Sequence, residues 1–261
     1  MRYIKLIVAF ARYCLIRDME FSKNFITTTL IHIFYIFVNL AFFTVIWLKV
    51  GGFGGMSTYE MLFFLGTFHL GDSIFMLFTF NGILSVPELI RKGDLDYILT
   101  KPVPSQFLAT FRKVDFFSLT DFIVGIGIII YSSYKMNLEF SFYTVICFLV
   151  LVVAGKVITY ALACLLITLS FIFIKIEAIF AIFEEIGQLQ RYPMGIYTPP
   201  FRMIFSIIFP TIIIANFPAY FVLGKLSVIE LAWLFIAGVF LLYACHRYWQ
   251  YGLRKYQSAS S

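Results

Sequence analysis

The sequence predicts an all-α membrane protein that crosses the bilayer several times. Of its 261 residues, 61% are apolar and 13% are charged, and the mean hydropathy is +0.92. A soluble domain is closer to half apolar and a quarter charged. The 33 Phe and 16 Tyr are too many for the core of a water-soluble chain of this length, so lipid must cover much of the surface.

Composition also excludes several classes of protein. The cysteines are scattered without CxxC spacing, which argues against a metal site or a disulfide framework; they are Cys14, Cys147, Cys164 and Cys245. The net charge of +6 is explained by Lys and Arg residues that flank the spans, so no nucleic-acid partner is expected. Met1–Met19 lacks a small-residue cleavage site, so we expect no cleavable signal peptide.

Residues 1–22 are predicted to form an amphipathic helix on the membrane surface. Arg2, Lys5 and Arg12 recur at helical spacing on a background of apolar side chains. Such a helix is too polar to cross the bilayer, and it suits the anionic inner face of the membrane.

Four apolar runs predict the first four transmembrane helices. Each is close to or above the roughly 20 residues that a bilayer core of about 30 Å requires. In chain order they are Phe25–Leu48, Tyr59–Phe80, Phe116–Tyr134 and Phe140–Ile172, and Ser227–Tyr248 is the last span. Glycines predict a flexible loop after the first span; they are Gly51, Gly52, Gly54 and Gly55. No internal repeat divides the chain, so we expect one membrane domain.

The fifth span has two candidates, residues 175–192 and residues 203–223. In the first interpretation, residues 175–192 form a polar span shielded by protein, and residues 198–224 are two half-helices that dip in from outside. In the second, the earlier segment is cytosolic and residues 203–223 cross the membrane. Both interpretations give six spans. Four prolines favour the first, because broken backbone at membrane depth needs a cover of protein or water; they are Pro199, Pro200, Pro210 and Pro218.

The distribution of Lys and Arg predicts that both termini lie in the cytosol. Five basic residues precede Phe25, five lie between residues 91 and 113, and three lie at the C-terminal end. The other loops carry one each, at Lys49, Lys135 and Lys225. Cytosolic loops carry the excess of Lys and Arg. We therefore expect a multi-pass protein of the cell membrane with an even number of spans.

A polar segment at residues 82–104 separates the second and third spans, and it is predicted to begin with a short helix. Ser85 and Glu88 have the spacing of a capping box, which places this helix at Val86–Lys92. Gly93 can supply the left-handed residue that ends it.

A second short helix is predicted at Leu95–Thr100. Asp94 can cap its start, and Pro102 ends it because the residue before a proline disfavours the helical conformation. Apolar side chains give the two helices one hydrophobic face, and charged side chains give the other. The segment is either a surface loop packed on the bilayer or an ordered element that contacts a cytosolic partner, and the capped helices favour the partner.

Gly93–Pro102 reads Gly-Asp-Leu-Asp-Tyr-Ile-Leu-Thr-Lys-Pro, and here the chain resembles a known family. The segment is similar to the Gly-(Asp/Glu)-Leu-Asp-x-(Leu/Ile)-Leu-x-(Lys/Arg)-Pro segment of permease subunits in ABC-2 type ABC transporters, especially a six-span bacterial group. Three other motifs agree, so the resemblance covers nearly the whole chain. They are Arg-Tyr-Pro at Arg191–Pro193, Tyr-x-Pro-Pro at Tyr197–Pro200 and Asn-Phe-Pro-Ala at Asn216–Ala219.

The resemblance implies a role for each special segment. Residues 82–104 would be the coupling helix that docks in a groove of an ATPase subunit. Residues 1–22 would be the interfacial connecting helix, and residues 198–224 an extracellular re-entrant hairpin. The expected ATPase-coupling residues are Glu88, Leu89, Arg91, Lys92, Gly93, Asp94, Leu95, Asp96, Tyr97, Lys101 and Pro102.

The resemblance also implies partners and a direction of transport. Members of this family pair two permeases, each with one ATPase, and most of them export. We therefore expect two copies of a cytosolic ABC ATPase and a second permease, which is either another copy of this chain or a different one.

The chain itself contains no nucleotide-binding or catalytic motif. Gly155-Lys156 and Gly224-Lys225 are not followed by Ser or Thr, so there is no P-loop. ATP and Mg are therefore expected in the ATPase partner, and no cofactor is expected in this chain. With three His residues, no HExxH and no GxSxG, the chain is not expected to be an enzyme.

Ionisable and polar residues inside the predicted spans are candidates for the transport pathway or the dimer interface. An ionisable group at membrane depth costs at least about 2.5–3.5 kcal/mol, so it normally faces a partner or a water-filled path. Lys156 is expected to pair with Asp121 or Asp72, and structural ion pairs near the interfaces are the alternative. The candidates are His69, Asp72, Asp121, Lys156, Glu184, Glu185, Gln188 and Arg191.

A secondary, ion- or proton-coupled transporter is the alternative function. Asp72, Lys156 and Glu184 would form its relay. Such carriers usually contain inverted repeats, and this sequence shows none, so ATP-driven transport is the preferred prediction.

Overall fold

The computed structural model describes residues 2–20, 22–50, 54–173, 176–207 and 210–256, and every element in these ranges is helical. Gly51, Gly52 and Lys175, which belong to predicted segments, lie outside them. Five helices are long and apolar enough to cross a membrane, or six if one sharply bent pair counts as a single span. The predicted all-α polytopic class is therefore confirmed.

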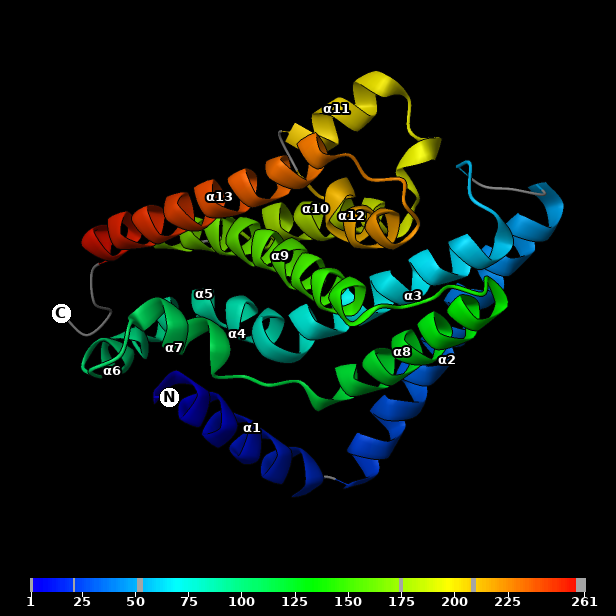
Figure 1. Cartoon of the computed structure of the whole chain (residues 1–261). Helices are drawn as coiled ribbons and strands as arrows, with labels where there is room; N and C mark the ends of the chain where they lie inside the picture. The colour runs from blue at the N-terminus through cyan, green and yellow to red at the C-terminus, as the bar shows by residue number, and fades with distance from the viewer. Residues whose placement is uncertain (1, 21, 51–53, 174–175, 208–209, 257–261) are drawn as a thin grey trace.

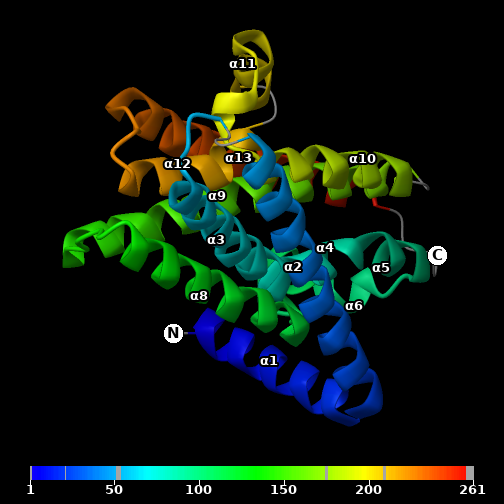
Figure 2. The same ribbon diagram turned by 90° about the vertical axis from the view of Figure 1, so that its right-hand side faces the viewer.

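The helices place both chain ends at the same end of the molecule. Figure 1 shows the two termini there together with α5, α6 and α7, and both views show α11 standing away from the bundle (Figures 1 and 2). In chain order the elements are α1 (Arg2–Glu20), α2 (Ser22–Val50), α3 (Thr58–Phe75), the π-helical η1 (Met76–Phe80), α4 (Asn81–Leu84), α5 (Val86–Lys92), α6 (Leu95–Leu99), α7 (Ser105–Phe111), η2 (Phe116–Ser118), α8 (Leu119–Lys135), α9 (Phe142–Ile167), η3 (Thr168–Phe171), α10 (Glu177–Gly187), η4 (Gln188–Arg191), η5 (Met194–Ile196), α11 (Pro199–Ile207), α12 (Ile212–Val222) and α13 (Val228–Lys255).

The second span is much longer than its predicted range. Thr58–Lys92 forms one helix of 35 residues, which combines α3, η1, α4 and α5. At 1.5 Å per residue it is about 50 Å long, whereas the bilayer core is about 30 Å thick. The π-helical turn leaves the Leu77 carbonyl free to accept a hydrogen bond of 2.9 Å from the Asp115 amide. The excess length carries α5 beyond the apolar part of the span.

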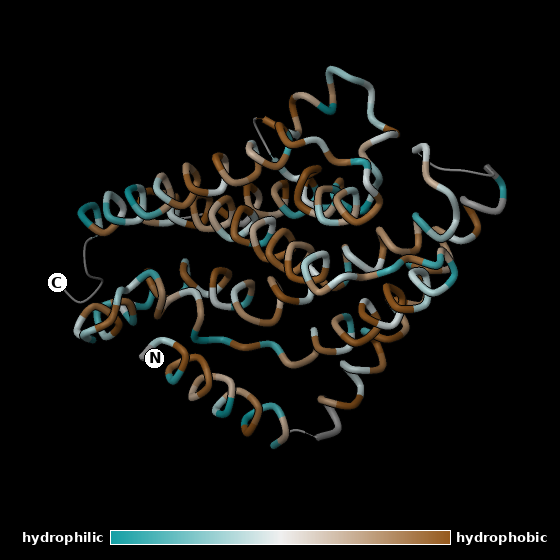
Figure 3. Tube along the Cα trace, viewed as in Figure 1, coloured by the Kyte–Doolittle hydropathy of each residue, from teal (hydrophilic) through white to brown (hydrophobic). Residues whose placement is uncertain are grey.

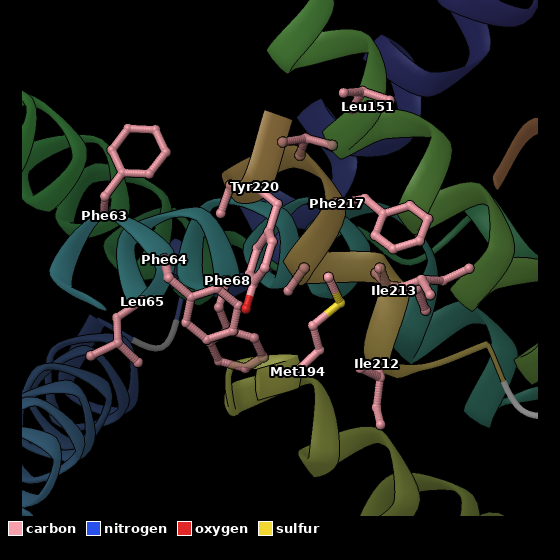
Figure 4. Close-up of a cluster of buried hydrophobic side chains, with 14 of the residues drawn as sticks. Phe63, Phe64, Leu65, Phe68, Leu151, Met194, Ile212, Ile213, Phe217 and Tyr220 are labelled. Atoms are coloured by element: carbon pink, nitrogen blue, oxygen red, sulfur yellow. The ribbon is translucent and has the colours of Figure 1, made fainter. Parts of the chain in front are cut away.

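The core centres on α3. In the most apolar 18-residue stretch of its span, 67% of the residues are buried inside the protein, whereas the corresponding stretch of α2 is 11% buried. Gly66 and Gly125 let α3 and α8 approach closely, since a Cβ on Gly125 would lie 2.7 Å from the Leu70 amide nitrogen. On the other side of α3, Phe64 and Phe68 pack with side chains of α12 and with Met194 (Figure 4).

The amphipathic pattern of α1 is visible along the chain trace. Hydrophilic and hydrophobic residues alternate on this helix (Figure 3), and Ile4 and Val8 are 68% and 62% exposed. Exposed apolar side chains beside exposed Lys5 and Arg12 are typical of a helix that lies in the headgroup region.

The region of the fifth span contains only short helices. α10 and η4 together cover 15 residues, Glu177–Arg191, about 25 Å of helix, which is short of a full crossing. α11 and α12 form the sharply bent pair, with an angle of 104° between them. The two helices have the form of the predicted half-helices, and residues 208–209 between them lie outside the described ranges.

Two predicted helix caps in the polar segment are wrong. Ser85 has helical dihedral angles and makes no cap bond; its hydroxyl instead donates to the Gly82 carbonyl at 2.7 Å. The reason is that the second span continues into α5, so there is no helix start to cap. Glu88 accordingly pairs with Lys92 at 2.7 Å instead of completing a capping box. Asp94 also makes no side-chain cap bond.

Candidate functional site

The end of the second span and α6 form a compact helical elbow, which we call the coupling segment (residues 86–99). α5 ends at Gly93, whose φ of +76° is the left-handed conformation that favours glycine. The chain then reverses into α6, as the sequence predicts. The two helices begin and end within one residue of their predicted bounds, Val86–Lys92 and Leu95–Thr100.

The inner face of the coupling segment is part of the protein core. Leu89 is 3% exposed, Leu95 is fully buried and Ile98 is 6% exposed. They belong to a buried cluster with Phe171, which follows α9, and Trp249 of α13. Burial of a large apolar side chain stabilises the fold by about 1.5–3 kcal/mol. The coupling segment is therefore fixed to the ends of two spans.

The following helix, α7, packs against both the second span and α13. A Cβ on Gly82 would lie only 1.9 Å from the Thr110 carbonyl oxygen, so α4 and α7 touch backbone to backbone. The indole of Trp249 donates to the Ser105 hydroxyl at 3.1 Å. The Gln106 amide lies 3.1 Å from the Cys245 sulfur, on α13. α5 and α6 are thus packed together with α7, α9 and α13.

The outer face of the coupling segment is exposed and charged. Tyr97 is 69% exposed, and the Lys101 amine lies 4.0 Å from the centroid of its ring. A hydrogen bond from Lys101 and its positive charge lower the pKa of Tyr97. Lys92 and Glu88 form an exposed pair along α5, which adds little to stability.

The structure divides the predicted ATPase-coupling residues into three sets. Leu89 and Leu95 face the protein interior and are not available to a partner. Gly93 and Asp96 are half-buried. The exposed members are Glu88, Arg91, Lys92, Asp94, Tyr97, Lys101 and Pro102.

A partly buried ion pair and a hydrogen bond join α3, α9 and η4. Lys156 of α9 donates to the Gln190 side-chain oxygen at 3.1 Å and lies 3.5 Å from the Asp72 carboxylate. The Lys156 side chain is 6% exposed, so it needs these partners. Its methylene stem occupies the space beside Gly71, where a Cβ would lie 2.7 Å from it. Of the two predicted acidic partners of Lys156, the structure pairs it with Asp72.

Asp72 also lines a small cavity of about 60 Å³ between α3, α9, α10 and α12. Glu184 and Gln188 reach the same cavity. Lys156 joins this group through its pair with Asp72. The structure thus brings four predicted pathway candidates together: Asp72, Lys156, Glu184 and Gln188. Glu185 lies apart from them and is exposed.

A second polar cluster joins α2, α3 and α8. The Asp121 carboxylate lies 3.2 Å from Nδ1 of His69 and 3.5 Å from Nδ1 of His32. His69 is 5% exposed, and the His32 ring stacks on Phe117 at 6.1 Å. The Asp121 carboxylate therefore contacts two histidines, which lie on neighbouring helices.

Arg191 connects the η4 turn to α2. Its guanidinium donates to the Tyr35 hydroxyl at 2.7 Å and lies 3.5 Å from the Asn39 side-chain oxygen. It also lies over the Phe68 ring at 5.5 Å, a cation–π geometry. The predicted candidate Arg191 is thus an interhelical contact residue.

The sequence did not single out Gln190 or Asn216 as candidate residues. Asn216 is fully buried in α12, and its amide accepts from the Met194 amide at 2.7 Å and donates to the Tyr192 carbonyl at 3.2 Å. The sequence feature that could have identified Asn216 as a candidate is its place in the Asn-Phe-Pro-Ala motif. Gln190 lies among several polar residues of similar spacing, and nothing in the sequence distinguishes it from Gln188.

Comparison with known proteins gives one clear relationship. A family model described as "ABC-2 family transporter protein" matches residues 33–260, which is most of the chain. Searches of curated proteins and of solved structures found no match. Among the described residues, no group of three or more His, Cys, Asp or Glu side chains is placed to hold a metal ion.

Proposed function

Since the chain belongs to the family of ABC-2 transporter proteins, we propose that it is the membrane-spanning subunit of an ATP-driven exporter. A permease of this family lies in a membrane and works with an ATPase subunit. We further propose that the ATPase is present in two copies, that it holds the ATP and Mg, and that a second permease completes the path. That permease is either another copy of this chain or a different one.

One observation carries the proposal: the coupling segment continues the second span as a helical, charged extension whose inner face is buried in the core. Thr58–Lys92 is one continuous helix, so a push on α5 is transmitted along its length. The inner face of the segment is buried against α9 and α13, and the outer face presents Arg91, Asp94 and Tyr97 to a partner. A passive loop needs neither property.

The mechanism we infer is a rigid-body movement. Closure of the two ATPase subunits on ATP pushes the coupling segments, and the spans attached to them shift together. The path then opens outward between the two permeases. We place the coupling segment and both termini in the cytosol, because the Lys and Arg excess lies at these positions.

The test is a charge swap on the outer face of the coupling segment. We expect Arg91→Glu with Asp94→Lys to reduce co-purification of the ATPase at least tenfold and to abolish transport, because like charges then meet across the interface. The matched control is Lys135→Glu with Glu139→Lys, an equal swap of exposed residues in the α8–α9 region. Normal assembly and normal transport by the first variant would refute the proposal.

An ion-coupled carrier is the second candidate, and one observation favours it. Lys156 pairs with Asp72, and Glu184 reaches the same cavity, as a charge relay would require. Transport that persists in cells lacking the ATPase subunit, and that stops in Asp72→Asn, would select this function over the first.

A further inference from the structure

A polar cavity lies where α1 meets the second span. It has a volume of about 330 Å³ and opens between Arg17 of α1, Asn81 and Ser85 of the second span, and Lys113. The cavity lies on the α1 side of α5 and takes no part in the transport mechanism described above.

The cavity lies in a cluster of positive charge. Burial, followed by the charge of Arg112, lowers the pKa of Lys113; Glu88 opposes this shift, and Arg17 acts in the same direction as Arg112. Lys113 therefore lies close enough to Arg112 and to Arg17 for each of them to repel it. No described carboxylate lies within salt-bridge distance of Lys113 or Arg112.

The nearest acids already have partners. Asp18 pairs with Arg17 at 2.9 Å, and Glu88, which lines the cavity, pairs with Lys92. Asp115 accepts hydrogen bonds from the Phe117 amide and the Ser118 hydroxyl.

A buried donor in the same cluster has no partner. Nε of Arg112 is inaccessible to solvent and makes no hydrogen bond within the described chain. An unpaired buried donor destabilises the fold unless a partner from outside the chain satisfies it. The Arg112 carbonyl accepts from the Cys14 thiol of α1 at 3.7 Å, so this arginine lies beside α1, next in sequence to the cavity-lining Lys113.

The surroundings of the cavity are those of a headgroup region. Ile16 and Met19, which flank Arg17 on α1, are 60% and 61% exposed, and Leu84 in the cavity wall is 41% exposed. Exposed apolar side chains next to cations mark the depth at which acyl chains meet phosphates. An acidic protein surface would leave these apolar side chains in water.

We propose that this cavity binds the phosphate of an anionic phospholipid. The phosphate oxygens accept hydrogen bonds from Arg17 and Lys113, and the cluster as a whole compensates the negative charge. A bound lipid would join α1 to α5 and so hold the coupling segment against the membrane surface. Free phosphate shares the same chemistry, and the experiment distinguishes the two sources.

The experiment measures the thermal unfolding midpoint of the purified full-length protein in detergent as a function of added ligand. The probes are dihexanoyl-phosphatidylglycerol, dihexanoyl-phosphatidylcholine and inorganic phosphate. The test variant is Arg17→Gln with Lys113→Gln, and the control is Lys49→Gln with Lys135→Gln, which removes two exposed charges that belong neither to α1 nor to the cavity. Both variants are first measured without ligand, so that a folding defect is seen directly.

We expect phosphatidylglycerol alone to raise the midpoint of the unaltered protein. Each cation near an anionic headgroup accounts for roughly a fivefold gain in affinity, so the test variant should bind about 30-fold more weakly and the control should bind normally. Equal stabilisation by inorganic phosphate would overturn the lipid assignment. Unchanged lipid binding by the test variant, with loss of ATPase co-purification, would show that these cations serve the ATPase instead.

Discussion

The coupling segment and the α11–α12 pair are similar in construction but face different surroundings. Each consists of two short helices with a sharp change of direction between them. The coupling segment exposes charged and hydroxyl-bearing side chains such as Arg91 and Tyr97, whereas α11 exposes Met203 and Ile207, at 64% and 50%. The polar side chains exposed on the first pair suit water or a protein partner, and the apolar side chains exposed on α11 suit an apolar medium.

The two pairs are also held in place by different forces. The inner face of the coupling segment is apolar and contributes Leu95 to the core. The α11–α12 pair depends in addition on a buried amide, because Asn216 bonds the backbone of Tyr192 and Met194. A chain break near water can use water for its free backbone groups, but a break at membrane depth needs a polar partner from the protein.

The largest effect is expected from removing that buried amide. Asn216→Leu keeps the size of the side chain but leaves the Met194 amide and the Tyr192 carbonyl unpaired. At about 1–3 kcal/mol for each group, the free energy of unfolding should fall by roughly 2–6 kcal/mol. Thr44→Val, at an exposed site on α2, should change it little. Both variants are compared by chemical denaturation. An equally small loss of unfolding free energy for Asn216→Leu would show that the α11–α12 pair, like the coupling segment, does not depend on a buried amide.

A somewhat smaller effect is expected from the apolar face of the coupling segment. Leu95 is fully buried, so Leu95→Ala should lower the free energy of unfolding by about 2–5 kcal/mol. Leu99 is 43% exposed, and Leu99→Ala should leave stability almost unchanged. The matched pair is compared by chemical denaturation. The reverse order of losses would mean that the segment presents its other face to the core.

The smallest effect compares Gly93, which lies between α5 and α6, with Gly224, which follows α12. Gly93 and Gly224 have φ values of +76° and +67°, so an alanine at either position should cost about 1 kcal/mol. Gly127→Ala, in α8 with open space around it, should be neutral or stabilising. Differential scanning calorimetry of the three variants measures this. If Gly93→Ala left the unfolding free energy unchanged, the turn between α5 and α6 would not need a left-handed residue.

The sequence predicted well those features that depend on local chemistry. Hydropathy located the long spans, and Gly93 and Pro102 bounded the two short helices to within a residue. The capping bonds of Ser85 and Asp94 were predicted wrongly. Ser85 lies where the second span continues into α5, and Asp94 already has helical dihedral angles and makes no side-chain cap bond. Glycine is unfavourable inside a helix, yet Gly82 lies within α4. A glycine is needed there because the Thr110 backbone occupies the space that a side chain would fill.

Contacts between distant residues could not be derived from the sequence alone. Both Asp72 and Asp121 were possible partners for Lys156, and only the packing of α3 on α9 selects the first. The role of Gln190 depends on the turn from α10 into η4, which brings its side chain to Lys156. Such pairings are set by tertiary packing between helices and leave no local pattern.

The most direct test of the central claim places a photo-cross-linking phenylalanine derivative at one exposed site on each pair. The sites are Tyr97 in the coupling segment and Met203 in α11, which have similar exposure. After irradiation of intact cells, position 97 should capture the ATPase subunit, and position 203 should capture none of it. Capture of the ATPase from position 203, or no capture from position 97 in a complex that transports normally, would contradict the account.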